Sequence, residues 1–351
     1  MEKVAILAIT KNGIKIASKI KQFFPVWEIF APSKFHDNAI DAKWYEEQTG
    51  AKIAELFSKY DGLVCMFSLG AVIRLIAPYL KDKKTDPAVI VIDDKAGFVI
   101  SALSGHLGGA NELTEEIASK LGATAVITTA ADVNKTIPVD LVGKEFGWKI
   151  DDDSSVTKIS AMMVNEEKIG IYQDAGERNW WKGDLPKNVT VYDTLEKLQQ
   201  SDSKAYLIIS DKVLDGDILK NSVVYRPQTL VAGIGLHGDT SMEKIKESLL
   251  VCLSKYGLSP KSITRLASLK KPNDVQGLVD VARDFDVPLE YFDRVELAKI
   301  SIPNPSEIVQ VYEGTPSVSE AAAIKASHGK LVVEKQKFPP DLTIAIARIE
   351  K

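Results

Sequence analysis

Short, uninterrupted apolar runs alternate with amphipathic segments in the first third of the chain, and this alternation restricts the fold more than any other feature. The runs at 62–67, 88–93 and 97–103 are almost free of polar residues, which is typical of strands buried on both faces. Between and around them, apolar residues recur at helical spacing in the segments 13–24, 49–59, 71–80 and 112–121. Strands that alternate with helices predict an α/β sheet covered on both faces.

The length and a change of pattern along the chain predict three domains. The 351 residues exceed the ~150 residues that one domain usually holds. Residues 1–146 are expected to form an N-terminal α/β domain. Residues 147–228, with their short strands, are expected to form a small α+β middle domain. Residues 229–351 open with an apolar strand at 230–235 and are expected to form a C-terminal α/β domain.

The strand predicted at 97–103 runs into a glycine-rich turn with the sequence Ser-Gly-His-Leu-Gly-Gly-Ala-Asn at 104–111, and a helix follows. Glycines permit positive φ and let a ligand approach the main chain. The free N–H groups at the start of the helix favour an anion. His106 adds a group whose reference pKa lies near neutrality. From the turn alone, two interpretations are equally open: a functional site, and a tight loop whose histidine caps another group.

Charge and cysteine content narrow the function classes. The net charge is −4, from 44 basic and 48 acidic residues, so no global field attracts nucleic acid. Cys65 and Cys252 lie far apart in apolar surroundings, which is typical of free thiols in a reducing cytoplasm. The four histidines lack metal-ligand spacing, so no metal site is expected. The chain starts directly with a strand, and its apolar runs are too short to span a membrane, so neither a signal peptide nor a membrane span is expected.

Residues 69–133 resemble the CbiG family of cobalamin biosynthesis, the cobalt-precorrin-5A hydrolases. Beside the turn at 104–111, the residues that match in order are Arg-Leu-Ile-Ala-Pro at 74–78, Lys-Thr-Asp-Pro-Ala-Val at 84–89, Val-Ile-Asp-Asp at 91–94, Gly-Phe-Val-Ile-Ser at 97–101 and Val-Ile-Thr-Thr-Ala at 126–130. Weaker matches follow at 233–235 and 314–322. At 236–239, Leu-His-Gly-Asp stands where the family has a cysteine and basic residues, so a cysteine nucleophile is unavailable there.

The resemblance implies a function in the anaerobic pathway to cobalamin (vitamin B12). The implied reaction is hydrolysis of the lactone of cobalt-precorrin-5A, with release of a two-carbon fragment as acetaldehyde. The enzyme would need no cofactor of its own, because the cobalt belongs to the corrinoid substrate. It would be cytoplasmic, would bind neither nucleic acid nor membrane, and could be a homodimer. Two alternatives stay open: a hydrolase that uses the turn to bind a carboxylate or phosphate, and a corrinoid carrier without catalysis.

Three residues are the candidate catalytic groups. His106 would act as the acid or base, Ser104 would orient water, and Asp132 would be the next candidate for proton transfer. For Ser104, a hydroxyl bonded within its own turn is an equally open alternative. The N–H groups of Gly108, Gly109 and Ala110 would be donors to an oxyanion.

The candidate substrate-binding residues lie in both halves of the chain. Arg74 would pair with a substrate carboxylate, with an internal ion pair or an exposed helix face as alternatives. Gly233 and Gly235 are predicted to form a turn whose N–H groups meet another carboxylate, and Ser317 would cap a helix at a third entrance. The alternative is that these glycines only shape turns. The remaining candidates are Lys84, Gly105, Gly108, Gly109, Asn111, Thr128 and Thr129.

Overall fold

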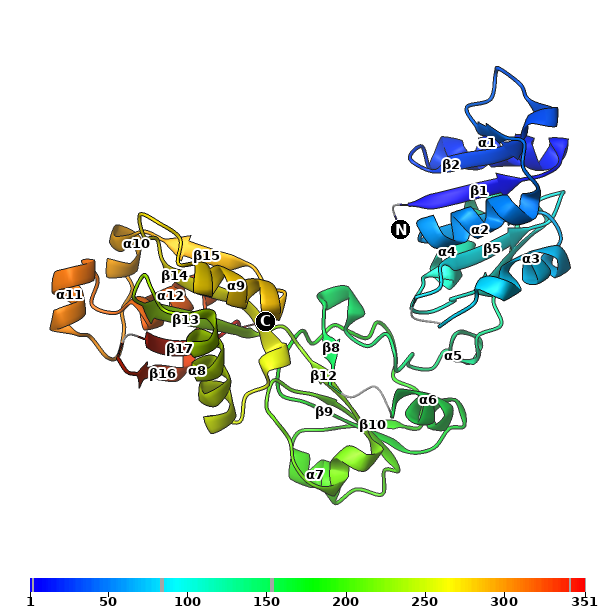
Figure 1. The fold of residues 1–351 in the computed structure, drawn as a ribbon. Helices are drawn as coiled ribbons and strands as arrows, with labels where there is room; N and C mark the ends of the chain where they lie inside the picture. The colour runs from blue at the N-terminus through cyan, green and yellow to red at the C-terminus, as the bar shows by residue number, and fades with distance from the viewer. Residues whose placement is uncertain (2, 83–84, 152–154, 341, 351) are drawn as a thin grey trace. The chain divides into compact units, whose positions relative to one another are not determined.

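The computed structural model describes residues 1, 3–82, 85–151, 155–340 and 342–350, and the chain forms two compact units, Met1–Leu141 and Val142–Lys351 (Figure 1). The predicted α/β class is confirmed, because the first unit holds one sheet and the second holds two, each with helices. The three-domain division at 146/147 and 228/229 stays a prediction.

Seven strands form the sheet of the first unit, in the order β3-β2-β1-β4-β5-β6-β7. Neighbouring strands are parallel except β5 and β6, which form the predicted hairpin. The strands are β1 (Val4–Ala8), β2 (Glu28–Pro32), β3 (Lys43–Tyr45), β4 (Gly62–Met66), β5 (Ala88–Ile92), β6 (Phe98–Leu103) and β7 (Thr124–Val126). The helices are α1 (Lys11–Phe23), α2 (Thr49–Lys59), α3 (Leu69–Ile76), α4 (Ala110–Leu121) and α5 (Ala130–Val133), with 3-10 turns at Ser33–Phe35 and Ala77–Tyr79.

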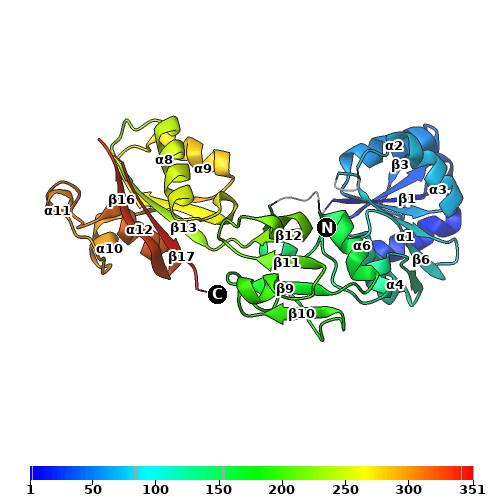
Figure 2. The same ribbon diagram turned by 90° about the horizontal axis from the view of Figure 1, so that it is seen from below.

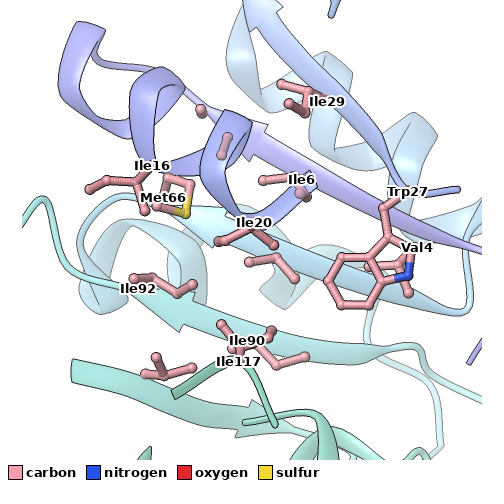
Figure 3. Close-up of a cluster of buried hydrophobic side chains, with 14 of the residues drawn as sticks. Val4, Ile6, Ile16, Ile20, Trp27, Ile29, Met66, Ile90, Ile92 and Ile117 are labelled. Carbon is pink, nitrogen blue, oxygen red and sulfur yellow. The ribbon is translucent and has the colours of Figure 1, made fainter. Parts of the chain in front are cut away.

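Both faces of this sheet are buried, as the unbroken apolar strands predict. Successive residues of a strand point to opposite faces. Val4 and Ile6 of β1 share one cluster with residues of α1 and α4, and Figure 3 shows Ile20 of α1 near the strands and Ile117 of α4 next to Ile90. The intervening residues of β1 face the other side, in a cluster with α2 and α3. The sheet is therefore a rigid centre, and its loops are free to carry function.

The first sheet of the second unit has the order β10-β9-β11-β12-β8. Its strands are β8 (Lys149–Ile150), β9 (Ile169–Gln173), β10 (Val189–Tyr192), β11 (Ala205–Ile209) and β12 (Ser222–Arg226). Its helices are α6 (Val156–Val164) and α7 (Leu195–Gln199), with 3-10 turns at Lys144–Phe146 and Asp217–Asn221. One detail differs from the predicted α+β arrangement: β9 to β12 are mutually parallel, and β8 alone is antiparallel to its neighbour.

The second sheet of this unit has the order β15-β14-β13-β17-β16. Its strands are β13 (Leu230–Leu236), β14 (Ile263–Leu269), β15 (Leu289–Phe292), β16 (Lys330–Phe338) and β17 (Leu342–Arg348). The helices are α8 (Met242–Lys255), α9 (Gln276–Phe285), α10 (Arg294–Ala298), α11 (Glu307–Glu313) and α12 (Val318–Ser327), with a 3-10 turn at Pro260–Ser262. Helices α8 and α9 pack on one face of this sheet and α12 packs on the other (Figure 2).

A buried carboxylate joins the two sheets of the second unit. Asp211 follows β11, and its side chain is fully buried. It accepts hydrogen bonds from Arg348 Nε and Nη2, both at 2.7 Å, and from Thr229 Oγ1 at 2.8 Å. Thr229 and Arg348 belong to the C-terminal sheet region, so this one carboxylate connects the start and the end of that region to the middle sheet.

Candidate active site

The turn at 104–111 links β6 to α4, as predicted, and close contacts fix its shape. Ser104 adopts φ 56°, and its hydroxyl donates to the carbonyl oxygen of Asp86 at 2.9 Å. A Cβ on Gly105 would lie 2.6 Å from Asn111 Oδ1, so this glycine lets the asparagine side chain fold back over the turn. Gly109 stands before α4 with φ +79°, a conformation that costs glycine little.

His106 lies between two carboxylates that face its two ring nitrogens. Nε2 lies 2.9 Å from Asp132 Oδ2, and Nδ1 lies 3.6 Å from Asp140 Oδ1. The side chains of His106 and Asp140 are each 15% exposed, whereas that of Asp132 is 40% exposed. Asp140 is therefore the inner partner of the imidazole, and Asp132 is the partner that solvent and a ligand can reach.

This arrangement favours the protonated imidazole. The Asp140 carboxylate raises the pKa of His106 above its ordinary value; burial opposes the shift, and Asp132 adds to it. Opposite charges close to a titratable group favour its charged form. His106 is therefore prepared to donate a proton at a pH where an isolated histidine would be largely neutral.

Asn111 extends the cluster away from the histidine. Its Nδ2 donates to Asp132 Oδ2 at 2.7 Å and to Thr129 Oγ1 at 3.0 Å, and its Oδ1 accepts from Ser101 Oγ at 2.6 Å. The Asp132 carboxylate thus accepts from both His106 and Asn111. Buried and half-buried networks of this kind hold their members in one geometry.

The prediction that backbone amides of the turn bind an oxyanion is partly wrong. The N–H of Gly109 donates to the carbonyl oxygen of His106 at 3.0 Å, and the N–H of Ala110 donates to that of Ser104 at 3.2 Å. Both amides therefore close the turn. In the described part of the chain, the Gly108 N–H has no such partner and stays available.

Arg74 and Thr128 do not join the cluster. Arg74 lies exposed on α3 and donates to the carbonyl oxygen of Gly70 at 3.2 Å, which agrees with the exposed-face alternative. Thr128 is exposed and, within the described ranges, makes no side-chain hydrogen bond. Lys84 lies outside the described residues.

Gly233 and Gly235 lie within strand β13, so the predicted glycine turn is wrong. A Cβ on Gly233 would lie 1.9 Å from the carbonyl oxygen of Ser319. One on Gly235 would lie 2.5 Å from Thr343 Oγ1 on the neighbouring strand and 3.2 Å from Val318 Cβ. These glycines therefore let α12 approach the strand closely. Ser317 does precede α12 as its N-cap residue, although its side chain makes no capping hydrogen bond.

Sequence reasoning missed Asp140 and Ser101. Asp140 follows Ile137 and Val139, which are each 1% exposed and anchor the segment in the interior. A carboxylate among buried apolar residues, a few positions after Asp132, is a signal that could have been noticed. Ser101 lies inside β6, where the alternation of side chains does not reveal which polar group faces the turn.

Across the described ranges, no three or more His, Cys, Asp or Glu side chains gather in a way that could hold a metal ion. The helices of the described residues do not combine the length and apolar character that crossing a bilayer requires.

Comparison with known proteins gives matches along nearly the whole chain. Three family models match in order: cobalamin synthesis G N-terminal at 51–132, cobalamin biosynthesis central region at 137–227 and cobalamin synthesis G C-terminus at 230–347. The chain is 40% identical to the cobalt-precorrin-5A hydrolase of Priestia megaterium, over 98% of this chain and 94% of that protein. It is 28% identical to the Salmonella typhimurium enzyme of the same name, over 95% and 94%. A crystal structure of a cobalamin biosynthesis protein G homologue from Sulfolobus solfataricus aligns over 99% of this chain and 98% of that one, with 24% identity and a TM-score of 0.40.

Proposed function

The chain belongs to the cobalamin-synthesis G (CbiG) family, and we propose that it is a cobalt-precorrin-5A hydrolase of the anaerobic cobalamin pathway, with the His106 cluster as its catalytic centre. The observation that carries this proposal is the 40% identity to a cobalt-precorrin-5A hydrolase over 98% of the chain. The geometry adds a proton-transfer pair on a rigid sheet. The cobalt enters as part of the substrate.

Opening a lactone needs a base for the attacking water and an acid for the departing ring oxygen. Asp132 is the exposed carboxylate of the pair and takes the proton of the water as its oxygen attacks the lactone carbonyl. His106, held protonated between Asp140 and Asp132, gives a proton to the ring oxygen when the carbon–oxygen bond breaks. The proton on Asp132 then returns to His106 across the 2.9 Å contact, which restores the starting state.

The other groups of the turn have supporting roles in this proposal. The tetrahedral intermediate carries an oxyanion, and the N–H of Gly108 is the turn amide that is free to stabilise it. Asn111 holds Asp132 in place through its 2.7 Å hydrogen bond. The Ser104 hydroxyl donates to Asp86, so the role of Ser104 is to shape the turn, and water is oriented by Asp132 instead.

The released fragment, the residues that bind substrate carboxylates, the compartment and the partners are proposed from the family and from general chemistry. The hydroxyl freed by lactone opening then loses its proton and becomes a carbonyl, the carbon–carbon bond to the macrocycle breaks, the macrocycle carbon takes up a proton, and the two-carbon fragment leaves as acetaldehyde. Arg74 and Lys84 bind substrate carboxylates. Cys65 and Cys252 are buried free thiols whose pKa values burial raises to about 12 and about 11, and such unreactive thiols suit a cytoplasmic enzyme. Nucleic acid and membrane are not among the proposed partners, and a homodimer is compatible with the proposal.

The decisive experiment is incubation of the purified protein with the lactone-bearing cobalt-precorrin, followed by measurement of product mass and trapping of acetaldehyde. Hydrolysis predicts the ring-opened, shortened product together with trapped aldehyde. Tight binding of an unchanged corrinoid would identify a carrier instead and would overturn the proposal.

A further inference from the structure

A cavity of about 230 Å³ lies in the second unit. The residues of the His106 cluster belong to the first unit, so none of them lines this cavity. The end of β13, the start of α12 and the β16–β17 hairpin surround it. Part of its wall is apolar, with Leu236, Val318 and Leu342 among the lining residues. Its volume equals that of roughly eight waters, taking about 30 Å³ for each, so a short aliphatic chain fits inside.

Ser317 is one of the residues that line this cavity, and its hydroxyl has no hydrogen-bond partner among the described residues. The residue is 1% exposed. It stands at the N-terminus of the ten-residue helix α12, whose first amides have no acceptor within the helix. Buried hydroxyls usually have a partner, so this one is open to an acceptor from outside the chain.

Positive charge surrounds the same cavity. Lys271, Lys335 and Lys337 line it, and Glu313 is the acidic residue among the described lining residues. Glu313 is already close to Lys271 at 3.5 Å and to Arg294 at 3.9 Å. Lys335 donates from its Nζ to the carbonyl oxygen of Asn304, and burial lowers its pKa. Lys337 on β16 is an exposed residue, and it makes no ion pair within the described ranges.

We propose that this cavity binds a carboxylate at the end of a short aliphatic chain. The Ser317 hydroxyl and the first amides of α12 donate to the carboxylate oxygens, Lys337 supplies the opposite charge, and the apolar wall contacts the methylenes. The carboxylate could belong to a side chain of a cobalt corrinoid, an assignment that rests on the proposed function, or to a free short-chain acid.

The test measures binding to the full-length protein by equilibrium dialysis with three probes: a cobalt corrinoid with free acetate and propionate side chains, its methyl ester, and propionate alone. The variants are Ser317→Ala and Lys337→Met. Lys330→Met is the matched control, because Lys330 lies on the same strand and forms an exposed pair with Glu350 at 2.8 Å. A hydrogen bond to a charged group is worth roughly tenfold or more in affinity.

The expected result is that both variants weaken binding of the carboxylate probe at least tenfold, that Lys330→Met leaves it unchanged, and that the ester binds weakly. Competition by propionate would assign the site to a free acid, and its absence to the corrinoid side chain; both outcomes support a carboxylate site. Binding within twofold of wild type in both variants, or equal binding of the ester, would overturn the proposal.

Two controls separate this proposal from the proposed function. A melting curve checks folding: Ser317 makes no capping bond, so Ser317→Ala should leave the melting temperature unchanged or raise it. Turnover of the lactone substrate is measured alongside. If the wild type turns over the lactone and both variants bind the probe as the wild type does, the cavity proposal alone is wrong. If the wild type shows no turnover and the variants lose binding of the probe, the hydrolase proposal alone is wrong.

Discussion

The same sequence pattern, an apolar strand, closely spaced glycines and a helix, has two different outcomes in this molecule. At 104–111 the glycines lie in a turn, and Gly105 makes room for a side chain, that of Asn111. At 233–235 they lie within β13, and Gly233 makes room for a helix backbone, that of α12. Glycine spacing therefore indicates close approach in both regions without revealing whether a ligand-facing loop or a packed helix approaches.

The two regions also differ in how completely their polar groups are paired. Around His106, the side chains of Asp132, Asp140 and Asn111 each meet a side chain of the same unit, and two carboxylates face the one imidazole. Around Ser317, a buried hydroxyl and a lysine lack partners in the described residues. A closed network suits groups that must be preorganised for proton transfer, and an open one suits a site completed by its ligand.

The largest expected effect is the loss of catalysis in His106→Ala. Removal of a positioned acid should lower turnover by ~10²–10⁴-fold with little change in the melting temperature. Turnover and a thermal melt are measured on the same sample, with His36→Ala, an exposed histidine of the same unit, as the control. An unchanged rate would reduce the His106 cluster to a structural feature and remove the contrast with β13.

The next effect concerns stability and the packing role of Gly233. In Gly233→Ala the new Cβ meets two backbone atoms of α12, the Ser319 oxygen at 1.9 Å and the Ala323 nitrogen at 2.6 Å. Overpacking of this kind should lower the free energy of unfolding by about 1–3 kcal/mol or more. Urea denaturation measures it, and Gly238→Ala is the control, because a Cβ there meets nothing within 4 Å.

Gly105→Ala sharpens the same comparison. Its Cβ would meet the Asn111 amide, a side chain that can move. We therefore expect a clear loss of turnover and only a small decrease in the free energy of unfolding. If Gly105→Ala and Gly233→Ala lowered stability equally, the distinction between a turn glycine and a packing glycine would fail.

A smaller effect is expected for Asp140→Asn, and it appears as a shift in pH dependence. Asp140 is the main cause of the raised pKa of His106, so the variant lowers that pKa toward its ordinary value. If protonated His106 is the acid, the fall of turnover with rising pH moves to lower pH. The stability that comes from the raised pKa of His106 is complete below pH ~6.5 and is lost as pH rises through the folded-state pKa. The variant should therefore also lose this pH dependence. A pH–rate profile identical to that of the wild type would contradict the proposed role.

The smallest effect is expected for Arg74→Met, because its guanidinium is exposed. Substrate affinity should fall by at most about fivefold at low salt, and by less at high salt, since exposed pairs are weak and screened. Lys59→Met, another exposed cation of the unit, is the control. A strong drop in melting temperature would show instead that Arg74 is structural.

The sequence predicted those features that local pattern determines. The helix at 49–59 has the predicted bounds, and the turn before α4 lies where its glycines indicated. Helix α6 was missed, because its β-branched residues weaken the helical signal and tertiary packing decides its conformation. Asp140 and the role of Gly233 were missed for a related reason, because each depends on a contact between segments that are far apart in the sequence.

The buried Asp211 decides how the second unit can be divided. A break in the chain between 228 and 229 would leave Thr229 and Arg348 in one piece and their shared acceptor in the other. Loss of one partner from a buried ion pair costs about 3–5 kcal/mol, a large share of the roughly 5–15 kcal/mol that stabilises a typical domain. The middle and C-terminal sheets should therefore melt in one cooperative transition, and two polypeptides split at this point should become stable by complementing each other.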